Sequence, residues 1–231
     1  MKLIQHESDD AAVALAIDDA LLHQGGFYLS TRTNSPCVSI GLNQDAAAEV
    51  NLTAAKRLGV PVVRRKTGGG AVYRDGGCIA FSFIVPSVHR NEFIETLVQA
   101  LAMLGIKVEK TGHNDLFWRE RKVSGLAWSE FEDRVLIHGS ILFSTNLEIM
   151  SLMLDGGKAK YQGTSIASVR SRVTNLQTAF PDMHAETFRE LLQASLVSIL
   201  RKNRIVIRCG TVPEEVKMIA KERAESYHIQ P

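Results

Sequence analysis

The stretch VEKTGHNDLFWRERKVSGLAWSEFEDRVLIHGSILFST, residues 108–145, alternates short runs of β-branched and aromatic residues with compact polar segments. This pattern predicts four consecutive strands joined by tight turns at RERK and FEDR, which is typical of an antiparallel meander. Segments with helical periodicity lie outside it, at residues 9–26, 91–105 and 185–203. We therefore expect an α+β protein in which a mixed, largely antiparallel β-sheet is covered by helices.

The rest of the chain predicts more strands and no division into domains. FYLSTRT and PCVSIGL, residues 27–33 and 36–42, predict a hairpin. Further strands are predicted within residues 60–85 and 204–209. No linker or internal repeat interrupts these segments, so we expect residues 1–231 to form a single domain.

Composition and charge exclude several classes of protein. With 45% apolar and 23% charged residues, the chain is typical of a soluble globular protein and not of a disordered one. The formal net charge of +2 favours neither nucleic acid nor an anionic membrane as partner. The three cysteines, Cys37, Cys78 and Cys209, are far apart in the sequence, and the first 22 residues contain no long apolar run. We expect a cytoplasmic protein with reduced thiols.

Three consecutive glycines follow a cluster of basic residues in VVRRKTGGGAVYRD, residues 62–75. The spacing excludes a P-loop, because Lys66 and Thr67 precede the glycines. It also excludes a dinucleotide-binding fingerprint, because Tyr73 stands where the last glycine is required. What remains is a strand, a glycine turn and a return strand, in which backbone amides approach an anion and Arg65 adds a charged contact. A glycine turn beside a solvated basic strand end explains the segment equally well.

Together with this segment, two later stretches resemble the catalytic domain of the lipoate–protein ligase family, which belongs with the biotin protein ligases and octanoyltransferases. The resemblance extends over nearly the whole chain and includes LAIDDAL near the N-terminus. It implies a class II synthetase-like fold of the biotin and lipoate ligase type. The segments that carry it are RRKTGGGAVYRD at 64–75, GHNDLFWRERKVSGLAW at 112–128 with HGSILFSTNL at 138–147, and GTSIASVRSRVTNL at 163–176.

The resemblance also implies a reaction in two steps. Lipoate is first activated with ATP and Mg²⁺ to lipoyl-adenylate. The lipoyl group is then passed to a lysine of a lipoyl domain, in the E2 subunit of a 2-oxoacid dehydrogenase complex or in the glycine cleavage H protein. Joining a carboxylate to a phosphate brings two anions together, so such a site requires fixed cations where they meet.

By family position, those catalytic cations are Arg65, at the lipoyl-phosphate region, and Lys122, at the lipoyl carbonyl and the phosphate. From the residues alone, Lys122 could also be a solvated turn lysine and Asp115 a turn aspartate. His138 could be a core histidine whose hydrogen bonds are satisfied. The metal ligands are left unassigned. The other implied residues bind nucleotide (Gly70, Ala71, Val72, Tyr73, Asp75, Cys78, Ser140), bind lipoate (Gly68, Gly69, His138) or support the site (Thr67, Asp115, Ser124, Gly125).

The sequence departs from the family pattern at two positions and in length. Arg74 stands where many relatives have a histidine, so a role of that imidazole does not carry over. Cys78 stands where relatives often have an asparagine that reads adenine. We also expect the chain to lack the small C-terminal domain of long bacterial ligases. It is then a complete short ligase, a ligase that needs a separate accessory subunit, or an enzyme that only transfers a preactivated acyl group.

Three other functions remain as alternatives. A lipoyl or octanoyl transferase that works through a thioester needs a nucleophile, and Cys78 is the cysteine nearest a motif, although a buried core position suits it better. A non-catalytic module would bind acidic lipoyl-domain partners through RRK, RERK and the glycine- and serine-rich segment 155–175 with Arg170 and Arg172. A biotin ligase is disfavoured because its usual GRGRxGR-type loop is absent.

Overall fold

A computed structural model describes residues 1–5, 8–112, 114–155 and 172–229. His113, Arg170 and most of segment 155–175 lie outside the described residues. Within the described ranges, the main sheet has eight strands in the order β11–β1–β2–β6–β10–β9–β8–β7, and a second sheet has the order β4–β3–β5. The strands are β1 (Lys2–Gln5), β2 (Tyr28–Thr33), β3 (Cys37–Ile40), β4 (Val62–Arg64), β5 (Val72–Arg74), β6 (Cys78–Pro86), β7 (Glu109–Thr111), β8 (Asp115–Trp118), β9 (Arg121–Phe131), β10 (Arg134–Leu142) and β11 (Arg208–Thr211).

The predicted meander of four strands is confirmed as β7 to β10, each antiparallel to the next. The turn between β8 and β9 places Arg119 and Glu120 at φ of 50° and 60°, and Glu132 between β9 and β10 has φ of 53°. Such positive values are typical of the tight turns that match the twist of neighbouring strands. The meander is extended by β6, which pairs with β10 from Cys78 opposite Leu142 to Pro86 opposite Arg134.

The predicted hairpin of residues 27–33 and 36–42 is wrong. β2 lies in the main sheet between β1 and β6, whereas β3 crosses to the second sheet and lies between β4 and β5. All four residues of β3 are buried, so it is stabilised as a central strand covered on both faces. The segment with the three glycines therefore joins two strands that flank β3 and do not pair with each other. It crosses the end of β3 between Arg65 and Ala71.

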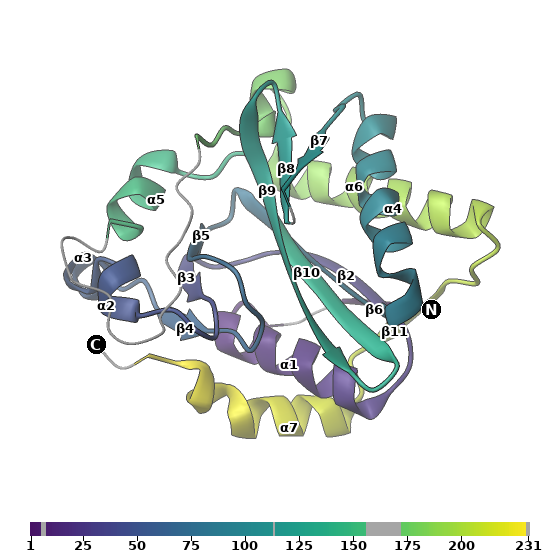
Figure 1. Cartoon of the computed structure of the whole chain (residues 1–231), viewed down its shortest axis with the longest axis horizontal. Coiled ribbons are helices and arrows are strands. Elements are labelled where there is room, and N and C mark those ends of the chain that lie inside the picture. The colour runs from purple at the N-terminus through teal and green to yellow at the C-terminus, as the bar shows by residue number, and fades with distance from the viewer. Residues whose placement is uncertain (6–7, 113, 156–171, 230–231) are drawn as a thin grey trace.

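Helices cover both faces of the main sheet (Figure 1). α4 (Arg90–Met103) and α6 (Ala185–Lys202) pack on the face that presents Phe83 and Ile137. α1 (Ala11–Gln24) and α7 (Glu214–Ala224) pack on the face that presents Ile84 and Leu136. Successive residues of β6 and β10 thus enter opposite hydrophobic clusters, as the alternation of side chains along a strand requires. The α+β class is confirmed.

Short helices cover the second sheet. α2 (Ala46–Glu49), α3 (Leu52–Leu58) and α5 (Leu147–Met153) surround a third hydrophobic cluster that includes Val38, Ile40 and Tyr73. α3 begins after Asn51, whose side chain accepts from the Ala54 amide, and ends at Gly59 in the left-handed region. The described part of the chain also forms the short 3-10 helices η1 (Ser87–His89), η2 (Leu176–Ala179) and η3 (Glu225–Tyr227). Within the described ranges, no helix has the length and apolar content needed to cross a bilayer.

Candidate active site

A cavity of about 420 Å³ lies between the glycine segment of the second sheet and the strands β9 and β10 of the main sheet. Four cationic side chains line it, but Asp115 is the one carboxylate among its described lining residues. Apolar groups on the wall include Phe81 and Leu126. The cavity therefore combines an apolar surface with an excess of positive charge, which suits an amphipathic anion. Its cations are Arg32, Arg65, Arg74 and Lys122.

Arg65 follows β4 and is 5% exposed. Its Nε and Nη2 donate to the Gly68 carbonyl at 3.0 and 2.7 Å, Nη2 also donates to Gly70 at 2.7 Å, and Nη1 donates to Ser39 at 2.9 Å. Burial, and secondarily the charge of Arg74, lowers the pKa of Arg65 to about 9, so the guanidinium stays charged at neutral pH. The side chain thus clamps the glycine segment to β3 while it lines the cavity.

The glycine segment is shaped by close contact as well as by these hydrogen bonds. Gly69 has φ of 87°, a value that side chains other than glycine rarely adopt. A Cβ on Gly41 would collide with the Gly69 carbonyl oxygen, so two backbones touch there. The contact of Gly41 was not predicted, because nothing in the sequence around the glycine after PCVSI indicates it.

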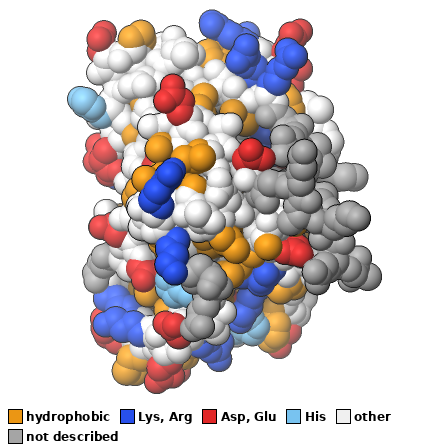
Figure 2. Space-filling view, turned by 90° about the vertical axis from the view of Figure 1, so that its left-hand side faces the viewer, with side chains coloured by type: hydrophobic (Ala, Val, Ile, Leu, Met, Phe, Trp, Pro, Cys, Tyr) orange, Lys and Arg blue, Asp and Glu red, His pale blue; other side chains and the backbone are white. Residues whose placement is uncertain are grey.

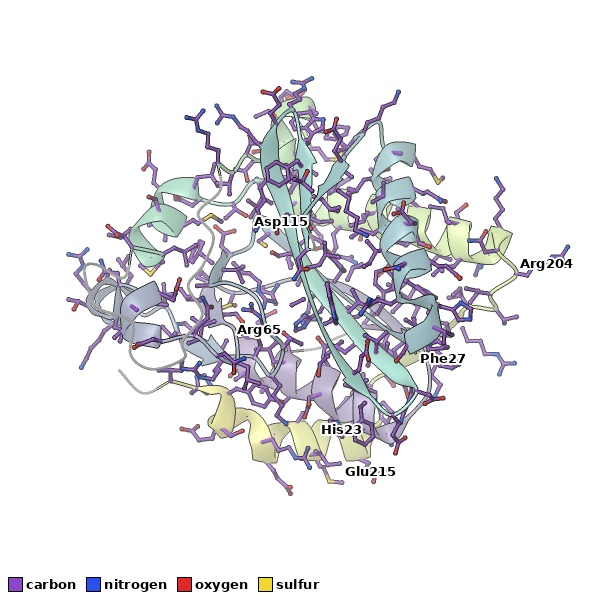
Figure 3. All side chains as sticks on the ribbon, viewed as in Figure 1. His23, Phe27, Arg65, Asp115, Arg204 and Glu215 are labelled. Carbon is purple, nitrogen blue, oxygen red and sulfur yellow. The ribbon has the colours of Figure 1, made fainter. Side chains whose placement is uncertain are left out.

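Lys122 lies on β9 beside Asp115 on β8, with 2.8 Å between Nζ and Oδ1. The two side chains are 23% and 25% exposed. A Cβ at Gly125 would lie 3.4 Å from Lys122 Nζ, so the small residue leaves room beside the ammonium. The Lys122 backbone is held by hydrogen bonds to Arg172 and Thr174. The structure thus brings Lys122, Asp115 and Gly125 together, and Figure 3 labels Arg65 on the glycine segment and Asp115 on β8.

His138 on β10 connects the glycine segment to α1. Its Nε2 is 2.7 Å from Thr67 Oγ1, and its Nδ1 is 3.9 Å from Asp18 Oδ2. Burial lowers the pKa of His138 although Asp18 opposes the shift, so the imidazole is neutral at pH 7. Asp18 is 1% exposed and also accepts from Ser82 at 2.7 Å and Arg32 at 3.3 Å. His138 lines the cavity and is a hydrogen-bonded core residue as well.

A second cavity of about 370 Å³ adjoins the first, toward α2 and α5. It is lined by Tyr73 and Ser124, which do not line the first cavity. The two cavities share five lining residues, so Lys122 lies where they meet. The shared residues are Ala71, Val72, Lys122, Gly125 and Ser140.

The family model described as the lipoyl protein ligase A/B catalytic domain matches residues 10–197. The chain belongs to this family.

Several members of the ligase family are similar over most of the chain. Lipoate-protein ligase LplJ of Bacillus subtilis is 35% identical over 215 residues, which are 87% of this chain and 63% of that protein's length. The structure of protein Ta0514 from T. acidophilum with bound lipoic acid is 26% identical, with a TM-score of 0.81, and covers 97% of this chain and 95% of that one.

Two further structures match as well. Lipoate-protein ligase A bound with ATP is 25% identical, with a TM-score of 0.81 and coverage of 97% and 94%. A structure of a bi-partite lipoate protein ligase and its E2 lipoyl domain from T. acidophilum is 25% identical, with a TM-score of 0.79 and coverage of 97% and 91%.

Four residues implied by the ligase family line neither cavity: Thr67, Gly68, Asp75 and Cys78. Asp75 accepts from the Gly77 amide at 3.0 Å and the Asn146 amide at 2.8 Å, so its carboxylate joins the turn after β5 to the start of α5. Cys78 is fully buried, and burial raises the pKa of its thiol to about 12. Cys78 packs in the third hydrophobic cluster, where β6 begins.

Two cavity residues and one residue behind the cavity wall were missed from the sequence. Arg32 and Arg74 line the cavity. Asp18 forms an ion pair with Arg32 at 3.3 Å, and its carboxylate lies 3.9 Å from His138 Nδ1. The available signal for Asp18 was an acidic residue within the apolar periodicity of LAIDDAL. Gly68 and Thr67 belong to the glycine segment but are not on the lining, whereas Gly69 and Gly70 are.

Proposed function

We propose that this chain is a lipoate–protein ligase, which activates lipoate with Mg-ATP to lipoyl-AMP and transfers the lipoyl group to a specific lysine of an acceptor domain. The observation that carries the proposal is the position of Lys122 where the two cavities meet, 2.8 Å from Asp115. LplJ is named a lipoate-protein ligase, and the similar structures hold lipoic acid in one case and ATP in another. These likenesses support the same reaction here.

In the activation step, the acid carboxylate attacks the α-phosphate and pyrophosphate leaves. Lys122 supplies a positive charge where the two anions meet, and Asp115 holds its ammonium in place. Arg65 contributes the charge of its buried guanidinium and keeps the glycine segment in position through the Gly68 and Gly70 carbonyls. We propose that the apolar wall of the first cavity takes the acyl chain and that the second cavity takes the nucleotide. Tyr73 and Ser140 line this second cavity.

In the transfer step, the acceptor amine attacks the acyl carbonyl, and AMP leaves. Negative charge develops on the carbonyl oxygen, and the Lys122 ammonium stabilises it. Cys78 takes no part, because a buried thiol whose pKa is about 12 is not a nucleophile at neutral pH. A direct transfer from the adenylate is therefore favoured over a thioester on this residue.

Magnesium is bound by few protein groups in this proposal. Among the described residues, no three His, Cys, Asp or Glu side chains lie close enough together to hold a metal ion. Mg²⁺ in nucleotide sites is held by one or two carboxylates and the phosphates. Asp115 lies at the first cavity and Glu49 and Asp155 lie at the second, so the residues suit Mg²⁺ that enters with ATP, where it would supply charge neutralisation at the phosphates.

The proposed acceptors are lipoyl domains of E2 subunits or the glycine cleavage H protein. The T. acidophilum structure that pairs a ligase with its E2 lipoyl domain supports the first of these. Figure 2 shows acidic and basic side chains interspersed over the face that it presents, so its described residues form no extended patch of one sign. Free Cys37, Cys78 and Cys209 support a reducing, cytoplasmic location.

We further propose that residues 1–231 act as one catalytic domain. β6 contributes Cys78 to the third hydrophobic cluster, Phe81 to the first and Ile84 to the second. A strand that takes part in all three clusters makes them mutually dependent, so we expect the described chain to unfold in a single transition.

The test is to incubate the purified protein with ATP, Mg²⁺, lipoate and an unlipoylated lipoyl domain, and to follow the intact mass of the acceptor. A parallel reaction receives preformed lipoyl-adenylate in place of ATP and lipoate. A lipoylated acceptor in both reactions is the expected result. Product from the adenylate alone would mean that activation requires a separate accessory subunit, and no product from either would refute the proposal.

A further inference from the structure

Arg74 is a buried cation of the first cavity. It ends β5, is 7% exposed and contributes to the cavity lining. The question is what compensates this charge.

The other three cations of the cavity have partners. Arg32 is 3.3 Å from the Asp18 carboxylate, Lys122 is 2.8 Å from Asp115, and Arg65 donates to three backbone carbonyls. By contrast, no hydrogen bond or ion pair joins the Arg74 guanidinium to another described residue. Its Nε is enclosed and has no hydrogen-bond partner among the described residues.

The nearest acidic residue in sequence does not compensate Arg74. The two carboxylate oxygens of Asp75 accept from the Gly77 and Asn146 amides, and no ion pair within 4.0 Å connects Asp75 to Arg74. Arg65 is close enough to Arg74 for the two charges to interact, which adds repulsion. A buried charge without a counter-ion is costly, so this arrangement is stabilised when an anion enters the cavity.

We propose that Arg74 binds an oxyanion of the ligand in this cavity, either the carboxylate of the acid or a phosphate oxygen of the nucleotide. A guanidinium presents its donors in a planar fork that matches both groups. The inference rests on the proposed function for the identity of the ligands, whereas the binding of an anion rests on the geometry alone. In the case of the carboxylate, Arg74 is a specificity residue that favours a charged acid over its neutral amide.

The test compares wild type with Arg74→Met, which removes the charge at similar volume, and with Arg74→Lys, which keeps the charge but loses the fork. Equilibrium titrations use lipoate, lipoamide and ATP. We expect Arg74→Met to weaken the binding of the anion that Arg74 contacts by roughly 10- to 100-fold. The affinity for lipoamide should not change. A loss confined to lipoate identifies the carboxylate, and a loss confined to ATP identifies the phosphate. Equal affinities of wild type and Arg74→Met for both anions would overturn the proposal.

Thermal stability without ligand separates a binding role from a structural one. Arg74→Met is expected to keep or raise Tm, because it removes an uncompensated buried charge. The matched control is Arg32→Met, which leaves the Asp18 carboxylate buried without its cation and is expected to lower Tm. A fall in Tm for Arg74→Met as large as that of the control, or its failure to fold, would assign Arg74 a structural role and refute the inference.

A titration with inorganic phosphate keeps this test independent of the proposed function. Phosphate is expected to raise the Tm of wild type more than that of Arg74→Met, each compared with chloride at equal ionic strength. If wild type binds neither lipoate nor ATP, the proposed function fails, but the phosphate result still decides the role of Arg74. The same phosphate response in both proteins would refute an anion site at this residue.

Discussion

Replacement of Lys122 by methionine is the sharpest test of the proposed chemistry, because the structure predicts a large effect on rate and a small one on stability. The charges of Lys122 and Asp115 are 2.8 Å apart. Their attraction is about 6 kcal/mol at an effective dielectric constant of about 20 and about 1.5 kcal/mol in water. Both side chains are about a quarter exposed, so solvation cancels most of this attraction. We expect a net contribution of about 1 kcal/mol or less to the free energy of unfolding.

The effect on catalysis has a different origin. A positioned charge at a developing oxyanion is typically worth about 100- to 1000-fold in rate, or about 3 to 4 kcal/mol of activation free energy. Loss of the ammonium should slow both lipoate-dependent ATP–pyrophosphate exchange and transfer from preformed lipoyl-adenylate by such factors. The free energy of unfolding, measured by urea titration, should change little.

The matched control for this experiment is Lys107→Met, because Lys107 is exposed and does not line either cavity. Its rates should equal those of wild type. The reasoning would be refuted if Lys122→Met kept both rates within about threefold of wild type, or if its loss of rate were matched by a loss of folded protein.

Three further results are expected. Gly69→Ala should lower the free energy of unfolding by about 1 to 2 kcal/mol, because φ of 87° strains an alanine and the added Cβ lies 3.0 Å from Arg65 Nη2; urea titration measures this. Cys78→Ser should leave transfer from lipoyl-adenylate unchanged but lower Tm, since it buries a hydroxyl in an apolar cluster; a hydroxylamine-sensitive acyl adduct lost in this variant would contradict the expectation. Because burial lowers the folded-state pKa of His138 below its unfolded value near 6.5, stability should be fully present above that pH and fall as the pH drops below it; urea titrations at pH 5 and 7.5 should show a smaller difference for His138→Gln than for wild type.

The fold was predictable where structure depends on neighbours in the sequence. The four strands of residues 108–145 follow from local alternation and from turns whose residues adopt positive φ at Arg119 and Glu120. The strands with which β2 and β3 pair were not predictable in this way, because the backbone groups at the edge of a strand do not specify a partner. Burial on both faces places β3 in the second sheet, and burial depends on the whole fold.

The site divides in the same manner. Lys122 and Asp115 lie on neighbouring strands joined by a tight turn, so their ion pair follows from the local hairpin. His138 and Thr67 are 71 residues apart in the sequence, and their hydrogen bond exists because β10 and the glycine segment meet across the two sheets. No local pattern indicates such a contact.

The amino-acid sequence alone determined the helices, the meander and the cationic character of the glycine segment. These features depend on residue types and on interactions over a few residues. Only the tertiary structure decided which charges are compensated. Asp18 neutralises Arg32, backbone carbonyls take the donors of Arg65, and Arg74 faces the cavity without a partner among the described residues. The reason is that desolvation and pairing of a charge depend on groups brought together from distant parts of the chain.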